Sequence, residues 1–236
     1  MQVSQIFISD SADGLPPYLS RCVERVKSAY AHMPHVLYGD PQLREFIQNH
    51  FDADVLLAYE KLNPYSYRSD LARYCLLYEL GGWYIDISIT PLTTLNVQSD
   101  VDTLACRDIQ MHSKTSWACS TAVLFSRSRH PVFETAIQKV VENCRTEYYG
   151  VSPLCPTGPT VLGQAFAEYG ADPRVVFGDL QALTPQHPNK NLAFVLPDGT
   201  LLALYKPAPA GDLAALGATG TNNYNDLYRA HTVYRP

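Results

Sequence analysis

Residues 69–89, SDLARYCLLYELGGWYIDISI, form the stretch that decides the fold. The first twelve residues contain no glycine or proline and are rich in good helix formers, so they predict a helix. Gly81 and Gly82 end this helix, because glycine adopts left-handed backbone conformations without a steric penalty. The remaining residues alternate between apolar and polar side chains, which is typical of a strand. The segment therefore predicts a helix that turns directly into a strand at residues 83–89.

The predicted strand carries one carboxylate, Asp86, among apolar residues. Burying it without a partner would cost free energy. Tyr84, Asp86 and Ser88 share one face, on which Asp86 and Ser88 lie about 7 Å apart along the strand. On the helix, Asp70 and Arg73 are three residues apart and are therefore neighbours. Taken alone, an Asp–Arg pair is most often an exposed ion pair worth less than about 1 kcal/mol. Taken together, the acids and the arginine indicate a polar site.

Apolar spacing and turn residues predict the other elements and the fold class. Strands alternate with helices in the first half of the chain, and the second half contains a hairpin signal around Asp198-Gly199. We therefore expect one α/β domain, residues 1–236, with a mixed, mainly parallel central sheet flanked by helices. The predicted strands are 5–9, 35–40, 102–108, 120–127 and a hairpin over 193–205; the predicted helices are 19–30, one from Pro41, 131–144 and one ending at Gly170, whereas 53–60 fits either a strand or a helix.

Composition and charge exclude several classes of protein. The 236 residues are 46% hydrophobic, which is ample for a buried core and argues against disorder. The net charge is −5 without a basic stripe, so nucleic acid is a disfavoured partner. The six cysteines form no CxxC pair, which favours buried free thiols over a zinc site. No secretory signal or long apolar segment is present, so we expect a cytoplasmic protein without a transmembrane segment.

The run YRSDLARYCLLYELGGWYIDISI resembles the signature of glycosyltransferase family 32, the DXD sugar-binding group, and that of the clostridial-toxin glucosyltransferases. The family pattern is roughly S-D-x-x-R, an apolar helix, and G-G-x-Y-x-D-x-D. Two other DxD matches, at 52–54 and 100–102, lack this context and are interpreted as loop acids. Weaker resemblances occur in SQIFIS, CPTGPTVL and the tail GTNNYNDLYRAHTVY. The residues in register with the signature are Ser69, Asp70, Arg73, Gly81, Gly82, Tyr84 and Asp86.

The resemblance implies a GT-A fold and a set of site residues. Residues 1–100 would bind the nucleotide sugar, and residues 101–236 would form the acceptor side with a C-terminal lid. The implied catalytic residues are Asp70 and Arg73, which would hold hydroxyls of the donor sugar, and Asp86, which would contact the ribose and the sugar and help to hold a divalent cation. The other implied nucleotide-sugar contacts are Phe7, near the base, and Ile8, Ser9, Tyr67, Ser69, Tyr84, Thr157, Gly158, Asn222 and Asn223.

Ser88 departs from the family pattern, which has a second carboxylate there as a principal ligand of Mn²⁺ or Mg²⁺. A cation is the usual way to neutralise the diphosphate leaving group, which carries about two to three negative charges. Three alternatives stay open. In the first, Ser88 is a weaker ligand, as the P-loop serine is for Mg²⁺, or acts through water. In the second, Asp86 holds the metal with tail groups such as His231. In the third, the site is metal-independent or inactive.

The favoured interpretation is a retaining glycosyltransferase that moves a hexose from a nucleotide-diphosphate sugar, preferably a UDP-sugar. The acceptor would be a glycan, a lipid-linked glycan or another hydroxyl compound, in surface polysaccharide synthesis. No second carboxylate is placed as an obvious nucleophile, which fits a front-face displacement. The alternative is a non-catalytic sugar- or nucleotide-binding module with a degenerate metal site, and a third is a structural subunit of a polysaccharide assembly complex. The absence of a predicted membrane segment permits a peripheral role at a membrane.

Overall fold

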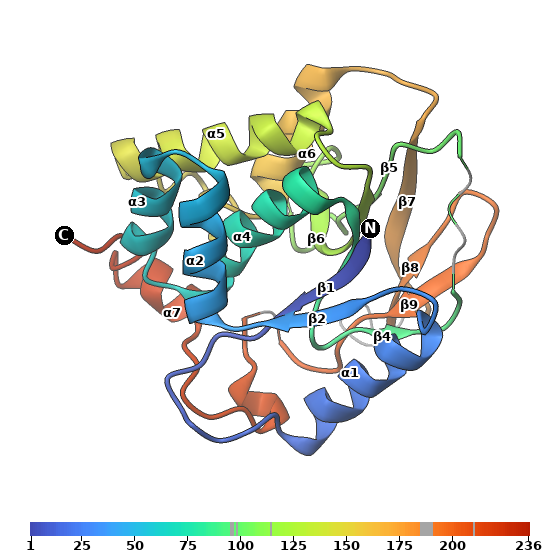
Figure 1. Cartoon of the computed structure of the whole chain (residues 1–236), viewed down its shortest axis with the longest axis horizontal. Coiled ribbons are helices and arrows are strands. Elements are labelled where there is room, and N and C mark those ends of the chain that lie inside the picture. Colours follow the sequence, from blue (N-terminus) through green and yellow to red (C-terminus); the bar gives the residue numbers. More distant parts are fainter. Residues whose placement is uncertain (95–96, 98, 114, 185–190, 210) are drawn as a thin grey trace.

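The computed structural model describes the chain except for residues 95–96, 98, 114, 185–190 and 210. The strands are β1 (Gln2–Ile6), β2 (His35–Tyr38), β3 (Gly82–Ile85), β4 (Thr90–Pro91), β5 (Thr103–Arg107), β6 (Cys119–Ser126), β7 (Val175–Ala182), β8 (Leu192–Val195) and β9 (Leu201–Leu204). The helices are α1 (Pro17–Ala29), α2 (Asp40–His50), α3 (Ala53–Lys61), α4 (Tyr65–Leu80), α5 (Pro131–Thr146), α6 (Pro159–Tyr169), the short 3-10 helix η1 (Ala214–Leu216) and α7 (Tyr224–Arg229). Helices α2 to α4 follow one another along the chain, as do strands β3 to β6 and β7 to β9 (Figure 1).

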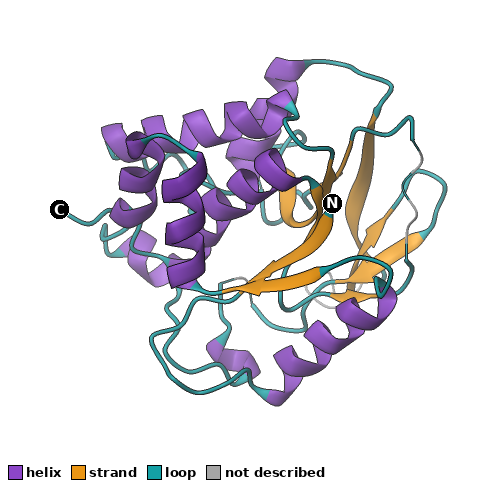
Figure 2. Cartoon of the chain, in the orientation of Figure 1, coloured by secondary structure: helices purple, strands orange, loops and turns teal. Residues whose placement is uncertain are grey.

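The described strands form one mixed sheet with the order β2-β1-β3-β6-β5-β7-β8-β9-β4 (Figure 2). Among them, β1 runs parallel to β2 and β3, and β5 runs parallel to β7, while the other five pairs of neighbours are antiparallel. The expectation of a mainly parallel sheet was therefore wrong. The reason is that β6 returns between β3 and β5, and the C-terminal strands β7, β8 and β9 follow one another in antiparallel pairs.

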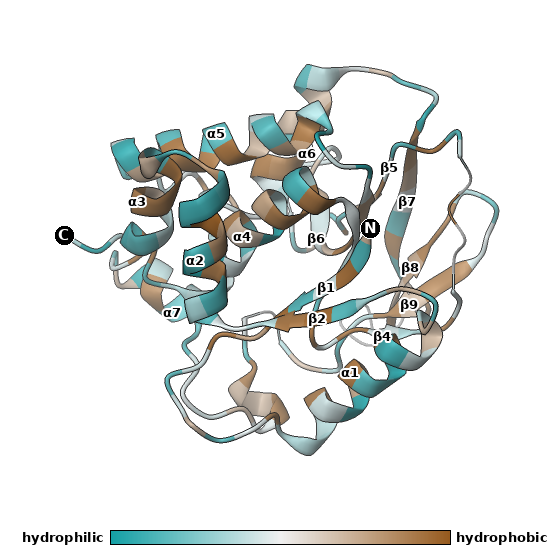
Figure 3. Cartoon of the chain, viewed as in Figure 1, coloured by the Kyte–Doolittle hydropathy of each residue, from teal (hydrophilic) through white to brown (hydrophobic). Residues whose placement is uncertain are grey.

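Two hydrophobic cores lie on opposite faces of the sheet. The larger core joins one face to helices α2 to α6, and Tyr84 of β3 belongs to it. The second core covers the other face, where Val26 of α1 packs with Trp83 and Ile85 of β3. Polar and apolar residues alternate along the outer helices α2 and α5 (Figure 3), as expected for helices with one face on a core.

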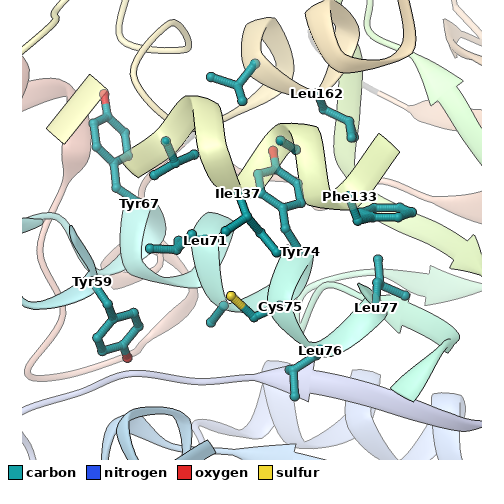
Figure 4. Packing of buried hydrophobic residues seen from close by; sticks show 14 of the residues in the cluster. Tyr59, Tyr67, Leu71, Tyr74, Cys75, Leu76, Leu77, Phe133, Ile137 and Leu162 are labelled. Carbon is teal, nitrogen blue, oxygen red and sulfur yellow. The ribbon is translucent and has the colours of Figure 1, made fainter. Parts of the chain in front are cut away.

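Helix α4 lies at the centre of the larger core, and ten of its sixteen residues are buried. Figure 4 shows Tyr74 and Leu77 of α4 beside Phe133 and Ile137 of α5. The ring centroids of Tyr74 and Phe133 are 6.3 Å apart. Because α4 is enclosed on most sides, its polar residues need partners inside the protein.

The double glycine joins α4 to β3 as predicted. Gly81 and Gly82 have φ angles of 62° and 96°, and a side chain on Gly82 would collide with the backbone of Gln2 in β1. The strand, however, ends at Ile85, and residues 86–89 form a turn in which the Ile89 N–H donates to the Asp86 carbonyl at 3.0 Å. The prediction of a strand through residue 89 was therefore wrong in its last four residues.

The other sequence predictions have mixed outcomes. Residues 53–60 lie in helix α3, and the hairpin around Gly199 is confirmed by the antiparallel pair β8–β9. Strand β7 and helix α7 were not predicted. The six cysteines are buried and free, as expected. In the described part of the chain, no helix has the length and apolar character needed to span a membrane.

Candidate active site

A pocket of about 320 Å³ opens at the carboxyl ends of the parallel strands β1 and β3. Phe7 and Ile8 follow β1, and Asp86 follows β3, so the pairing of the two strands brings these residues to one edge of the sheet. This edge is the usual place for ligands in α/β proteins. The first half of α4 and strand β6 form further walls of the pocket.

Asp70 lies in the wall formed by α4 and is 7% exposed. Its Oδ1 is 3.3 Å from Nη2 of Arg73 and accepts a hydrogen bond of 3.2 Å from the Thr121 hydroxyl. Its Oδ2 accepts a hydrogen bond of 2.8 Å from the Thr157 hydroxyl. Burial raises the pKa of Asp70, although the Arg73 charge and both hydroxyls oppose this effect. The carboxylate is thus held in one orientation at the pocket wall.

Arg73 is fixed by several contacts in addition to Asp70. Its Nε donates to the Ser69 carbonyl at 3.0 Å, and its Nη1 donates to the Thr121 carbonyl at 2.6 Å. The guanidinium lies 4.5 Å from the ring centroid of Tyr84, a cation–π geometry. Burial lowers the pKa of Arg73, but Tyr84 and the nearby acids raise it more, so the net shift is upward. The guanidinium therefore stays charged while its donors are largely committed.

Asp86 presents a carboxylate to the pocket directly after β3. Its Oδ1 accepts hydrogen bonds of 3.2 Å from the Tyr84 hydroxyl and from the Ile87 N–H. Within the described residues, no hydrogen bond involves its Oδ2. One oxygen of Asp86 is therefore available to a ligand.

The predicted metal ligands are not assembled around Asp86. Ser88 is buried in the turn after β3, and His231 lies beyond α7 with its ring 4.7 Å from that of Tyr149; neither lines the pocket. In the described chain, no three His, Cys, Asp or Glu side chains form a group that could hold a metal ion. The residues present do not fit the divalent-cation site that the family pattern implies.

The structure places the other predicted donor contacts in three groups. Thr157 and Tyr84 lie behind the pocket wall and support Asp70 and Asp86 through their hydroxyls. The Ser9 hydroxyl donates to the Thr219 carbonyl, and Asn223 caps helix α7, so these two side chains have structural partners outside the pocket lining. The predicted residues that line the pocket are Phe7, Ile8, Tyr67, Ser69, Asp70, Arg73, Asp86, Gly158 and Asn222.

Residues 16–112 match the family described as the glycosyltransferase sugar-binding region containing DXD motif. This region is therefore similar to the DXD glycosyltransferases. It contains α4, β3 and the pocket acids Asp70 and Asp86. Families with this motif generally use a divalent cation. Ser88 stands where their pattern has an acid that binds this cation.

Two curated proteins resemble this chain. One is inositol phosphoceramide mannosyltransferase 2 of Schizosaccharomyces pombe, with 26% identity over 137 residues, which are 57% of this chain and 37% of the relative. The other is an uncharacterized glycosyltransferase of Acanthamoeba polyphaga mimivirus, with 24% identity over 132 residues, which are 56% of this chain and 51% of the relative. The matches thus span between about a third and a half of the length of these relatives.

A solved structure titled PaToxG Glycosyltransferase has the same fold. The superposition has a TM-score of 0.58 and 15% sequence identity, and it covers 71% of this chain and 69% of that chain. At this identity the likeness concerns the fold alone. It confirms the expected GT-A architecture, with the largely antiparallel pairing described above.

Among the pocket residues that the sequence analysis missed, four come from the ends of two strands. Asp108 and His112 follow β5, and Tyr205 and Lys206 follow β9. Asp108 accepts hydrogen bonds from the Ser113 hydroxyl at 2.5 Å and from the backbone N–H of residue 109 at 3.0 Å. The available signal was position, because each pair lies at or just after the end of a predicted strand.

The C-terminal tail forms another part of the pocket wall and contacts the start of α4. Asn222 Oδ1 accepts a hydrogen bond of 3.0 Å from the Tyr65 N–H at the start of α4, and its Nδ2 donates to the Asn63 carbonyl at 3.2 Å. Further on, the Asn63 N–H donates to the Val233 carbonyl at 2.8 Å, and an isolated bridge joins residue 62 to Tyr234. The tail is thus attached to the residues that precede α4.

Proposed function

We propose that this protein is a retaining glycosyltransferase that moves a hexose from a nucleotide-diphosphate sugar to a hydroxyl acceptor. The observation that carries the proposal is the buried Asp70–Arg73 pair beside Asp86 in one pocket. The DXD family match to residues 16–112 supports it. The favoured donor is a UDP-sugar, and the favoured acceptors are a glycan or a lipid-linked glycan, as in surface polysaccharide synthesis.

The pocket residues supply the binding groups that such a donor needs. Asp70 is held by two hydroxyl donors and Arg73, so its carboxylate can accept hydrogen bonds from sugar hydroxyls with little reorganisation. The free Oδ2 of Asp86 can accept from a ribose or sugar hydroxyl. Phe7 follows β1 at the pocket edge and offers a ring to the base.

A second candidate is a non-catalytic module that binds a sugar nucleotide. The observation in its favour is Ser88, which is 1% exposed in the turn after β3 and stands where the family has an acid. This candidate predicts binding of the donor without turnover. The two candidates are therefore separated by a measurement of product release.

The test is release of nucleoside diphosphate from UDP-glucose, UDP-galactose, UDP-N-acetylglucosamine and GDP-mannose, with and without acceptor sugars. We expect the wild type to release a diphosphate from one donor and Asp70→Asn to lose this activity while its circular dichroism is unchanged. Asp226→Asn is the matched control, because Asp226 is exposed on α7 and pairs with the exposed Arg229. Donor binding without release would favour the non-catalytic module, and full activity of Asp70→Asn would contradict the assignment.

A further inference from the structure

Lys206 is a basic side chain in the pocket that the sequence signature does not include. We propose that its ammonium group holds the donor diphosphate directly, in the role that a divalent cation has in metal-dependent relatives. This inference rests on the proposed function, since it assumes a nucleoside-diphosphate donor. It adds a binding residue and a consequence, namely that the donor binds without a metal ion.

The position of Lys206 is fixed by the sheet. Strand β9 ends at Leu204, and the Tyr205 N–H continues its pairing by donating to the Leu192 carbonyl at 2.8 Å. Lys206 follows directly, is half-buried, and lines the same pocket as Asp86. The lysine therefore extends from an ordered strand end, and not from the tip of a long loop.

The ammonium of Lys206 is uncommitted. Within the described part of the chain, no hydrogen bond or ion pair within 4.0 Å involves it, whereas Lys27, Lys61 and Lys139 each pair with a glutamate. Burial lowers the pKa of Lys206, and the charges of Asp86 and Asp212 only partly oppose this. An anion bound beside the ammonium would favour its charged form and compensate for the lost hydration.

The charges of the pocket leave this role to Lys206. Asp70 is paired with Arg73, and most donors of Arg73 are already used by backbone carbonyls and by that carboxylate. Asp108 accepts two short-range hydrogen bonds and has His112 Nδ1 at 3.4 Å. A diphosphate entering a pocket with three carboxylates needs positive charge nearby, and among the described pocket residues Lys206 is a cation for which no hydrogen bond or ion pair is formed.

Ser88 acts in the same direction. A carboxylate at position 88 would add negative charge two residues after Asp86, which suits a metal ion but repels, from behind the pocket wall, a diphosphate that no metal screens. A serine there removes this repulsion. As the acceptor hydroxyl oxygen bonds to the anomeric carbon, the bond between that carbon and the diphosphate oxygen breaks and its electron pair stays on the diphosphate. The fixed ammonium stabilises the added charge, and the acceptor proton passes to the released diphosphate.

The test is titration calorimetry of the full chain with UDP, GDP and ADP, each with excess chelator and each with Mn²⁺. We expect the wild type to bind one diphosphate in chelator with an affinity within about 3-fold of that in Mn²⁺. A lost charged hydrogen bond should weaken binding by about 10- to 100-fold in Lys206→Ala. Lys206→Arg should retain most of the affinity, because it keeps a charged donor. The corresponding nucleoside should bind equally to all three proteins.

Lys27→Ala is the matched control, because Lys27 is exposed on α1 and pairs with Glu24. Binding that requires Mn²⁺, or an unchanged diphosphate affinity of Lys206→Ala in chelator, would overturn the inference and leave the proposed function intact. Equal losses for diphosphate and nucleoside would also overturn it, since they indicate a general disturbance of the pocket. If no nucleoside diphosphate binds under either condition, both the inference and the proposed function fail.

Discussion

Helix α4 carries two buried arginines that pair with aspartates, and the two pairs differ in what lies beside them. Arg68 is 3.2 Å from Asp40 at the start of α2, and its Nε donates to the Leu62 carbonyl at 2.7 Å. Arg73 is 3.3 Å from Asp70 on its own helix. Arg68 and Arg73 are each 4% exposed, so burial alone does not distinguish the two arginines.

The difference is the pocket. Asp70 and Arg73 line it, whereas Arg68 and Asp40 do not. Arg68 joins α4 to α2 and to the end of α3, and the Tyr59 hydroxyl of α3 donates to Asp40 at 2.8 Å. The same ion pair therefore has a structural role in one place and a ligand-binding role in the other. A buried acid–arginine pair indicates function only where a cavity reaches it.

The largest expected effect is on stability, in the pair away from the pocket. Arg68→Ala leaves Asp40 without its cation and Leu62 without a donor, so the free energy of unfolding should fall by about 3–5 kcal/mol. Urea denaturation measures this change. Arg145→Ala, which removes an exposed i,i+3 pair with Glu142, should cost less than about 1 kcal/mol. Equal costs for the two variants would contradict a structural role for Arg68.

The second effect is on activity, in the pair at the pocket. Asp70→Asn removes the charge that would accept from the donor sugar, so kcat/KM should fall by at least about 100-fold, or about 3 kcal/mol. The free energy of unfolding should change less than in Arg68→Ala, because the amide oxygen still accepts from one of the two hydroxyls, Thr121 or Thr157, and only the other hydrogen bond is lost. A loss of folding that matches the loss of activity would remove the contrast between the two pairs.

A smaller effect comes from the tyrosines that support the two sites. Tyr84→Phe removes the hydroxyl at Asp86, and Tyr59→Phe removes the one at Asp40. We expect each substitution to remove about 1 kcal/mol of free energy, the net contribution of one hydrogen bond. Tyr84→Phe should lower donor affinity about 5-fold, whereas Tyr59→Phe should lower only the free energy of unfolding. Calorimetry and urea denaturation of both variants test this assignment, and the reverse pattern would contradict it.

The smallest effect is a dependence of stability on pH. Burial raises the pKa of Asp70 above its ordinary value of 3.8, so the folded protein keeps this proton to a higher pH than the unfolded chain does. Between these two pKa values the contribution of Asp70 to stability falls as pH rises, by at most about 1.4 kcal/mol per pH unit. The stability of the wild type relative to Asp70→Asn should therefore increase as the pH is lowered towards the ordinary pKa of 3.8. An opposite trend in urea denaturation would show that pairing with Arg73 outweighs burial.

The parts of the fold that depend on neighbouring residues were predictable from the sequence. The helix α4, the break at Gly81-Gly82 and the strand β3 follow from local composition, and the parallel pairing of β1 with β3 brings Asp86 to the pocket. The Asp70–Arg73 pair was equally visible, since the two residues are three apart on one helix.

The parts that depend on distant pairing were not predictable. The direction of β6 between β3 and β5 is set by contacts across the sheet, which no periodicity reveals. Lys206 and Asp108 belong to no motif, and they reach the pocket only because β9 and β5 end nearby. The turn after Asp86 was missed because Ile87 and Ile89 continue the apolar alternation and are buried all the same.

The attachment of the tail to residues 62 and 63 also bears on the entropy of ligand binding. Tail residues such as Asn222 and Tyr224 line the pocket, while Val233 and Tyr234, which do not line it, bond to the segment before α4. The backbone that follows the pocket-lining tail residues is therefore already fixed in the folded protein. The tail then loses less conformational entropy when a donor binds. We expect residues 232–236 to contribute to donor affinity without touching the donor.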